Sequence, residues 1–128
     1  MRAVDTNVLV RLLTMDDAKQ ARAAEAFVTA ADHAWISHVV LVETVWVLES
    51  VYERRRDEVA ATVKTLLDHE FFVLQDVDVV SRAYDLFIRA TSVGFSDCLV
   101  LETARKAGCL PLGTFDKALS ALDGAERL

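Results

Sequence analysis

Four acidic residues stand at positions where carboxylates could do chemistry. Asp5 follows the apolar start MRAV, Glu43 lies in SHVVLVETVWVLES, Asp97 in GFSDCLVLETA and Asp116 in LPLGTFDKAL. Grouped carboxylates repel one another and raise each other's pKa, and a bound divalent cation removes that penalty. Because hard oxygen ligands suit Mg²⁺ or Mn²⁺, we expect a site of this kind to favour phosphodiester hydrolysis by a metal-activated water.

Each of the three aspartates also has a structural interpretation. Asp5 closes an expected strand, and Asp116 lies at an expected strand-to-helix junction. At a helix start an Asp side chain accepts a hydrogen bond from a free backbone N–H. Asp97 follows Ser96, an expected N-cap, so its charge complements the dipole of the first helical turn. A structural role at a helix start therefore accounts for any one aspartate taken singly.

Glu43 has no capping explanation, because it lies in the middle of an expected helix. Its neighbours are apolar on both sides, so we expect that helix to be buried on nearly every face. A carboxylate is almost never fully buried without a partner, and burying one alone is costly enough to neutralise it. The alternatives are a helix turned so that Glu43 reaches solvent, or a pair with an arginine.

Short apolar segments alternate with helical patterns along the chain, which favours an α/β domain with a mainly parallel sheet. The expected strands cover Arg2–Asp5, Ala34–Ile36, Phe71–Leu74, Leu110–Leu112 and Ala125–Leu128. The expected helices cover Thr6–Thr14, Asp16–Ala31, His38–Tyr52, Arg54–His69, Val77–Ala90, Ser96–Ala107 and Phe115–Leu122. Ligands of such sheets bind beyond the carboxyl ends of the strands, so we expect the four acids to converge at one end of the sheet.

Length and charge limit the function classes. The chain has 128 residues, 53% of them hydrophobic, and its net charge is −6, so we expect one domain over 1–128 without uniform attraction to nucleic acid. Asp5 and Arg11 interrupt any secretory pattern. The apolar run from Val39 is broken by Glu43 and Glu49, short of the roughly 20 residues that a membrane span needs. The simplest expectation is a cytoplasmic protein without a membrane segment.

Other catalytic chemistries lack their residues. His33, His38 and His69 are scattered, and Cys98 and Cys109 have no partners at zinc-site spacing. We expect both cysteines to be free thiols packed as small core residues. Neither a G-x-S-x-G nucleophile motif nor a Gly-rich phosphate loop is present.

Four stretches in order, AVDTNVLVRLL, ISHVVLVETVWVL, FSDCLVLETA and GTFDKAL, make the chain resemble the PIN-domain ribonucleases. It is most similar to the VapC toxins of type II toxin–antitoxin pairs. The resemblance runs nearly end to end. It implies a PIN-like three-layer α/β/α sandwich, with a central, mainly parallel sheet of about five strands.

The resemblance also implies an activity and its residues. VapC-like toxins are metal-dependent endoribonucleases that cut RNA, often tRNA or rRNA, and so inhibit translation. They usually form homodimers and are wrapped by a VapB-like antitoxin. The acids that would hold one or two Mg²⁺ or Mn²⁺ ions are Asp5, Glu43, Asp97 and Asp116. The polar residues that would orient these ligands or water are Thr6, Asn7, Ser37 and Thr114.

Basic residues near the acids are the candidates for RNA contact. Arg11 lies on the first expected helix and Lys117 directly follows Asp116. Either side chain could offset the negative charge locally and bind phosphate. The alternative for each is a solvated surface charge.

Three other functions remain open. A haloacid-dehalogenase-type phosphatase also has an Asp after its first strand, but it expects a second Asp where this chain has Asn7. A receiver-type regulator expects adjacent acids after that strand, and here Asp5 stands alone. A non-catalytic PIN-like scaffold or RNA-binding module is the third alternative, and the four acids count against it.

Overall fold

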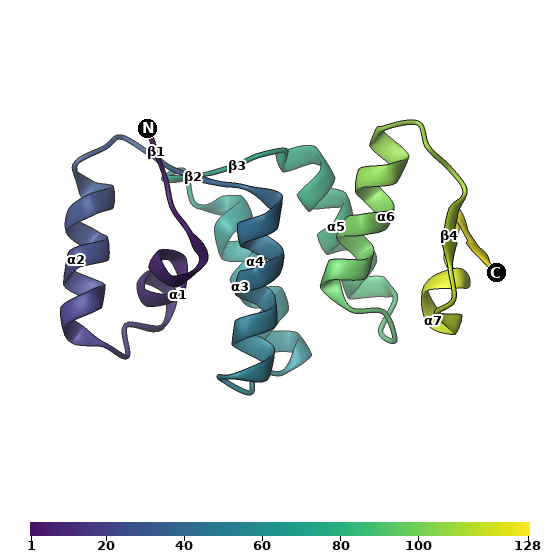
Figure 1. The fold of residues 1–128 in the computed structure, drawn as a ribbon, viewed down its shortest axis with the longest axis horizontal. Helices are drawn as coiled ribbons and strands as arrows, with labels where there is room; N and C mark the ends of the chain where they lie inside the picture. Colours follow the sequence, from purple (N-terminus) through teal and green to yellow (C-terminus); the bar gives the residue numbers. More distant parts are fainter. The chain divides into compact units, whose positions relative to one another are not determined.

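The computed structural model describes all residues, 1–128, and they divide into two compact units. The N-terminal unit is Met1–Val77 and the C-terminal unit is Asp78–Leu128. In chain order the elements (Figure 1) are β1 (Arg2–Ala3), α1 (Thr6–Thr14), α2 (Ala18–Thr29), β2 (Ala34–Ile36), α3 (His38–Ser50), α4 (Arg56–Asp68), β3 (Phe72–Leu74), α5 (Val77–Arg89), α6 (Phe95–Lys106), β4 (Leu112–Thr114), α7 (Lys117–Ser120) and β5 (Ala125–Arg127). None of these helices has both the length and the apolar character that crossing a membrane requires.

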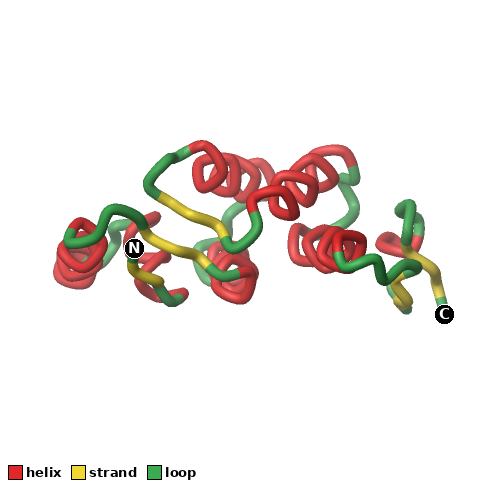
Figure 2. Tube along the Cα trace, turned by 90° about the horizontal axis from the view of Figure 1, so that it is seen from above, coloured by secondary structure: helices red, strands yellow, loops and turns green.

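The sheet of the N-terminal unit is parallel, with strand order β1-β2-β3. Figure 2 shows its three short strands beside one another. Arg2 pairs with Ala34, and Ile36 pairs with Leu74. Parallel neighbours need crossover connections, which usually contain helices. Helices α1 and α2 connect β1 to β2, and α3 and α4 connect β2 to β3.

Helix α1 is central to the N-terminal unit because it contacts both α2 and α3. Its Leu9 and Val10 are buried, as are Ala24 on α2 and Val45 on α3. Close packing of these side chains fixes the position of α1 and therefore of the polar residues at its start.

The C-terminal unit contains α5, α6 and α7 with a second parallel sheet of β4 and β5. Phe87 and Phe95 are buried and meet edge to face, with ring centroids 5.8 Å apart. The five parallel strands agree with the sequence expectation, and their pairing divides them into a sheet of three and a sheet of two.

Two local expectations are wrong. The strand expected at Leu110–Leu112 begins at Leu112, because Pro111 has no N–H to donate, whereas the Leu112 N–H donates to the Gly124 carbonyl at 2.8 Å. The expected N-cap Ser96 lies inside α6, whose N-cap is Gly94. The buried ring of Phe95 is already part of the helix.

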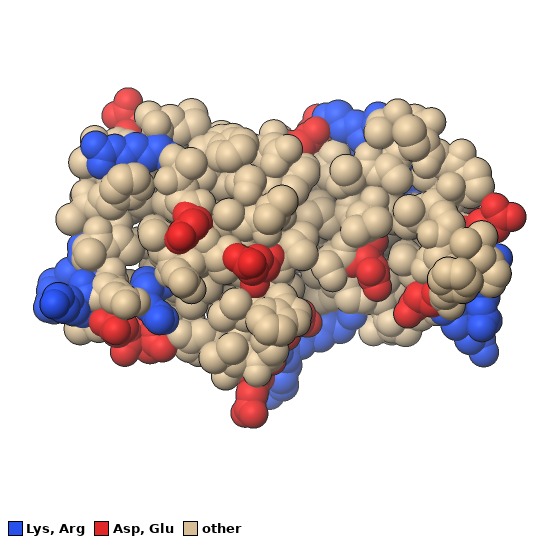
Figure 3. All heavy atoms as spheres, in the orientation of Figure 1, with Lys and Arg blue, Asp and Glu red and all other residues tan.

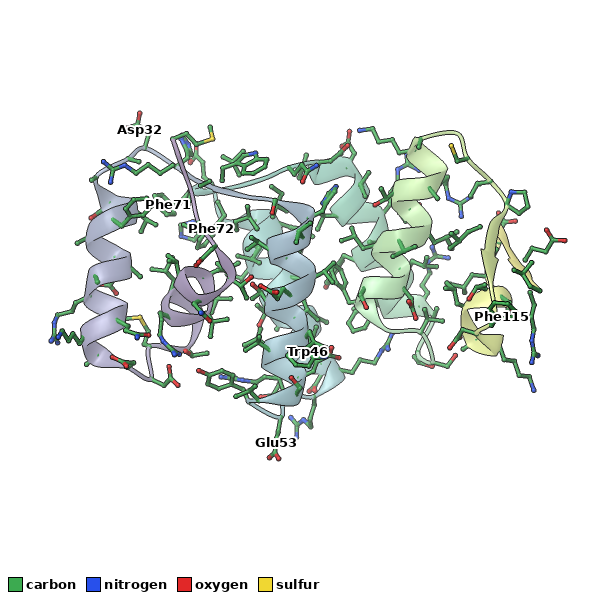
Figure 4. All side chains as sticks on the ribbon, viewed as in Figure 1. Asp32, Trp46, Glu53, Phe71, Phe72 and Phe115 are labelled. Carbon is green, nitrogen blue, oxygen red and sulfur yellow. The ribbon has the colours of Figure 1, made fainter.

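The expected burial of α3 is also wrong. The segment is helical, but only one side is covered, with Leu41 and Val45 among its buried residues. Val39 is 76% exposed and Trp46 63% exposed, and Glu43 between them is exposed too. Figure 4 shows Trp46 projecting from this helix. Apolar residues on every face indicate a hydrophobic helix, but they do not show which face its neighbours cover.

The expectation for the cysteines is confirmed in part. Both are free thiols, and Cys98 is buried in α6. Cys109 is exposed beyond the end of that helix, so the expectation that it packs in the core is wrong. It follows Gly108, whose positive φ of 74° turns the chain away after α6.

Candidate active site

Asp5 lies between β1 and α1 and caps the helix, as the sequence predicts. Its Oδ1 accepts a hydrogen bond from the Val8 backbone N–H at 3.0 Å. The side chain is exposed and its Oδ2 accepts no hydrogen bond. Because the cap uses one carboxylate oxygen, the other remains available to a ligand.

Glu43 reaches the start of α1 from the middle of α3. Thr6 Oγ1 donates a hydrogen bond to Glu43 Oε1. Thr6 is buried while the residue Glu43 is exposed, so a buried hydroxyl orients a carboxylate at the surface. Glu43 therefore reaches solvent, which is one of the two alternatives expected from the sequence. The hydrogen bond from Thr6 explains how its carboxylate is oriented.

Asp97 and Asp116 are the two candidate acids of the C-terminal unit. Asp97 lies in the first turn of α6, as expected. Asp116 caps α7, accepting the Leu119 backbone N–H at 2.8 Å. Partial burial raises the pKa of Asp97 above its usual value, and the negative charge of Asp116 raises the pKa further. Asp97 thus lies close enough to Asp116 for the charge of Asp116 to affect its pKa.

None of the four acids forms an ion pair. Other acids of the chain do, including Asp16 with Arg11 and Glu102 with Arg105. Over α1 and α3, Figure 3 shows separate groups of acidic atoms surrounded by uncharged ones. Unpaired carboxylate oxygens are the donors that Mg²⁺ and Mn²⁺ prefer, so the donor chemistry fits such a cation.

The four acids are divided equally between the two units, with Asp5 and Glu43 in the first and Asp97 and Asp116 in the second. Neither unit by itself groups three His, Cys, Asp or Glu side chains into a metal-binding cluster. The convergence of all four at one site stays a prediction.

The polar residues expected around the site have identifiable local contacts. Ser37 caps α3, its Oγ accepting the Val40 N–H at 3.1 Å. Thr114 Oγ1 accepts the Asp116 N–H at 3.0 Å and so holds the backbone of that acid. The Asn7 side chain is exposed, makes no hydrogen bond, and lines a surface pocket with Asp5. Their role in orienting ligands stays a prediction.

Arg11 is more constrained than the sequence suggests. Its Nη1 donates to Asp16 Oδ1 at 3.1 Å and to the Tyr52 hydroxyl at 3.0 Å, and its Nε donates to Gln20 Oε1 at 2.6 Å. The hydrogen bond with Tyr52 and nearby acids raise the pKa of Arg11. Lys117 is exposed beside Asp116. RNA contact by either side chain stays a prediction.

The groups around Arg11 could not be found from the sequence. Tyr52 lies 41 residues away in the chain, and no local pattern connects such a pair. The spacing of Gln20, Ala24 and Phe27 does mark one face of α2. It does not show that this face meets Asp5, as the pocket lining does.

Comparison with known proteins identifies a relative and a family. The chain is 25% identical over 125 residues to a VapC ribonuclease of Aquifex aeolicus (strain VF5), covering 95% of this chain and 92% of that relative. The PIN domain family model matches residues 2–125, nearly the whole chain. With its mixed α/β fold and parallel strands, the chain therefore belongs to the PIN domain family.

Proposed function

We propose that this chain is a Mg²⁺- or Mn²⁺-dependent endoribonuclease that hydrolyses RNA phosphodiester bonds. Asp5, Glu43, Asp97 and Asp116 would be its metal-binding and catalytic acids. The observation that carries the proposal is that all four carboxylates lack an ion pair. The family membership and the similarity to a VapC ribonuclease support it.

The side chains have separate tasks in this proposal. Asp5 would present the oxygen that its helix cap leaves free, and Glu43 would present a carboxylate oriented by Thr6. The negative charge of Asp116 disfavours the ionised form of Asp97, so uptake of a cation would relieve this repulsion. A bound Mg²⁺ or Mn²⁺ supplies charge for the phosphate oxygens and acidifies an attacking water.

In the cell, we propose that the chain is the toxin of a toxin–antitoxin pair. Cleavage of tRNA or rRNA would inhibit translation, and a VapB-like antitoxin would block the acidic site. The chain would act in the cytoplasm as a homodimer. The similarity to a VapC ribonuclease supports the toxin assignment, and light scattering of the purified chain tests the dimer.

Cleavage of RNA by the purified chain tests the enzyme. We expect total RNA of the host to be cut with Mg²⁺ or Mn²⁺, and EDTA to stop cleavage. We also expect cleavage to fall to background in each of four variants: Asp5→Asn, Glu43→Gln, Asp97→Asn and Asp116→Asn. Asp32→Asn is the matched control, since Asp32 is also exposed and outside any ion pair. Metal-loaded chain that is free of antitoxin and cuts no host RNA would instead support the non-catalytic scaffold or RNA-binding module.

Expression in the host tests the toxin assignment separately. We expect growth and translation to stop, and co-expression of a neighbouring VapB-like gene to restore both. The Asp97→Asn variant should not stop growth. Cleavage of RNA in vitro without growth arrest would indicate a housekeeping nuclease instead of a toxin.

A further inference from the structure

A pocket of about 420 Å³ opens between the start of α1 and the face of α2 that carries Gln20, Ala24 and Phe27, entirely within the N-terminal unit. Helices α1 and α2 lie side by side in Figures 1 and 2. The pocket is lined by Asp5, Asn7, Val8, Arg11, Gln20, Ala23, Ala24 and Phe27. Its volume falls in the range of roughly 300–1,000 Å³ that is typical of small-molecule sites, which is enough for one nucleoside.

Arg11 is a rigid part of the pocket wall. Hydrogen bonds to Asp16, Tyr52 and Gln20 use its Nη1 and Nε atoms and hold the guanidinium plane in place. Its Nη2 makes no hydrogen bond within the chain. Because Asp16 already balances the charge of Arg11, the wall is better suited to a neutral, planar group than to a free phosphate.

Two side-chain amides provide hydrogen-bonding groups. Arginine has no acceptor, so Gln20 must turn its oxygen toward Arg11 and keep its N–H groups as donors. The exposed amide of Asn7 has both its donor and its acceptor free. Donors and acceptors of this kind match the edges of an unpaired base.

Phe27 adds an aromatic surface to the same pocket. Its side chain is 42% exposed, and the Arg2 guanidinium lies 4.8 Å from the ring centroid. Arg2 Nη1 also donates to the Phe27 carbonyl at 3.2 Å, which fixes this pair. Exposed aromatic rings with arginines beside them are typical surfaces for stacking unpaired bases.

We propose that this pocket binds one unpaired base of the RNA substrate, next to Asp5. The inference rests on the proposed ribonuclease function and adds a subsite to it. Gln20 and Asn7 would contact the edge of the base, Phe27 would stack on it, and Arg11 would form a fixed wall. The subsite would then favour cleavage in single-stranded segments with a preferred base at that position.

Nucleotide titrations followed by NMR test the subsite without any cleavage step. The uniformly labelled full chain is titrated with each of the four nucleoside 5′-monophosphates, and with inorganic phosphate as a control. We expect at least one nucleotide to shift the backbone amides of Val8, Ala23 and Ala24 and the side-chain amide of Gln20, and phosphate alone to leave them unchanged. Shifts confined to other residues, or equal shifts with phosphate, would overturn the inference.

Substitutions in α2 provide the second measurement. Gln20→Leu and Phe27→Ala should each weaken binding of the nucleotide about tenfold. Both should raise KM for RNA while kcat stays within about twofold. Ile88→Ala is the control, because Ile88 is a similarly exposed apolar residue on α5. Unchanged affinity and KM in both variants would overturn the inference.

The two proposals fail in distinguishable ways. Nucleotide shifts in the pocket without any metal-dependent cleavage would reject the ribonuclease function and keep a base-binding site. Metal-dependent cleavage, with no nucleotide-induced shifts in the pocket and an unchanged KM in the variants, would keep the ribonuclease function and reject the subsite.

Discussion

Thr6 Oγ1 donates a hydrogen bond to Glu43 Oε1, so the first residue of α1 holds the carboxylate in the middle of α3. Thr6 directly follows Asp5 in the chain. The bond therefore brings the Glu43 carboxylate to the same end of α1 that Asp5 caps. A single buried hydroxyl thus connects the two candidate acids of the N-terminal unit.

Removing this hydroxyl is expected to lower activity more than stability. Thr6→Val keeps the shape of the side chain but removes the donor, so Glu43 loses its fixed orientation. We expect RNA cleavage to fall roughly tenfold or more, as is typical when a partner of a metal ligand is lost. Thr6→Ser restores the donor and should recover most of the rate. Single-turnover cleavage and thermal denaturation of both variants measure this, and equal rates in the two would contradict the role of the hydroxyl.

Asp5 has two tasks that substitutions can separate. Asn and Ser cap helices about as well as Asp does, whereas replacement of a cap by Ala costs roughly 1 kcal/mol. Asp5→Asn and Asp5→Ser should therefore keep the free energy of unfolding while abolishing metal-dependent cleavage. Asp5→Ala should lose both. Urea denaturation and cleavage assays on the three variants test the separation, and full activity in Asp5→Ser would show that the cap is the only task.

Features that depend on nearby residues were predictable from the sequence. The caps by Asp5 and Asp116 are local, because each side chain accepts an N–H only three residues ahead. Helix α1 and strand β2 have the expected bounds for the same reason. The expectation that Ser96 caps α6 is wrong because the adjacent Phe95 fills a buried position within the helix. Capping preference does not take such burial into account.

Features that depend on distant residues were not predictable. Glu43 is a candidate ligand in the sequence because a buried carboxylate would need a partner, yet the structure exposes it. Its helix is apolar all round, so composition could not show that Val39 and Trp46 would also remain uncovered. The contacts of Arg11 with Tyr52, and of Thr6 with Glu43, join residues 41 and 37 positions apart. Only the packing of α1 against α3 brings these partners together.

Asp97 is expected to make the metal-free chain less stable as the pH rises. Burial, and then the charge of Asp116, raise the pKa of Asp97 in the folded chain above its value in the unfolded chain. The folded chain therefore keeps this proton to higher pH, and stability falls as the pH passes from the unfolded to the folded pKa. In EDTA, Asp97→Asn should be more stable than the unsubstituted chain at pH 7 and equally stable below about pH 3.9, the usual pKa of Asp. Urea denaturation across this pH range measures the difference in stability. An Asp97→Asn variant that is less stable than the unsubstituted chain at pH 7 would contradict the prediction.

Tyr52 is expected to control the ionisation of Asp16. Its hydroxyl donates to Asp16 Oδ2 at 2.7 Å, and this bond, followed by one from Thr14, lowers the pKa of Asp16. A lowered pKa means that the ionised form stabilises the folded chain above the unfolded pKa, and that this contribution is lost as the pH falls. Tyr52→Phe should raise the pKa of Asp16 and reduce this loss of stability on the acid side, because a partner of the ionised form is gone. Carboxyl NMR titration of Asp16 in both chains measures the shift. An unchanged titration would mean that Arg11 and Thr14 hold Asp16 without the hydroxyl.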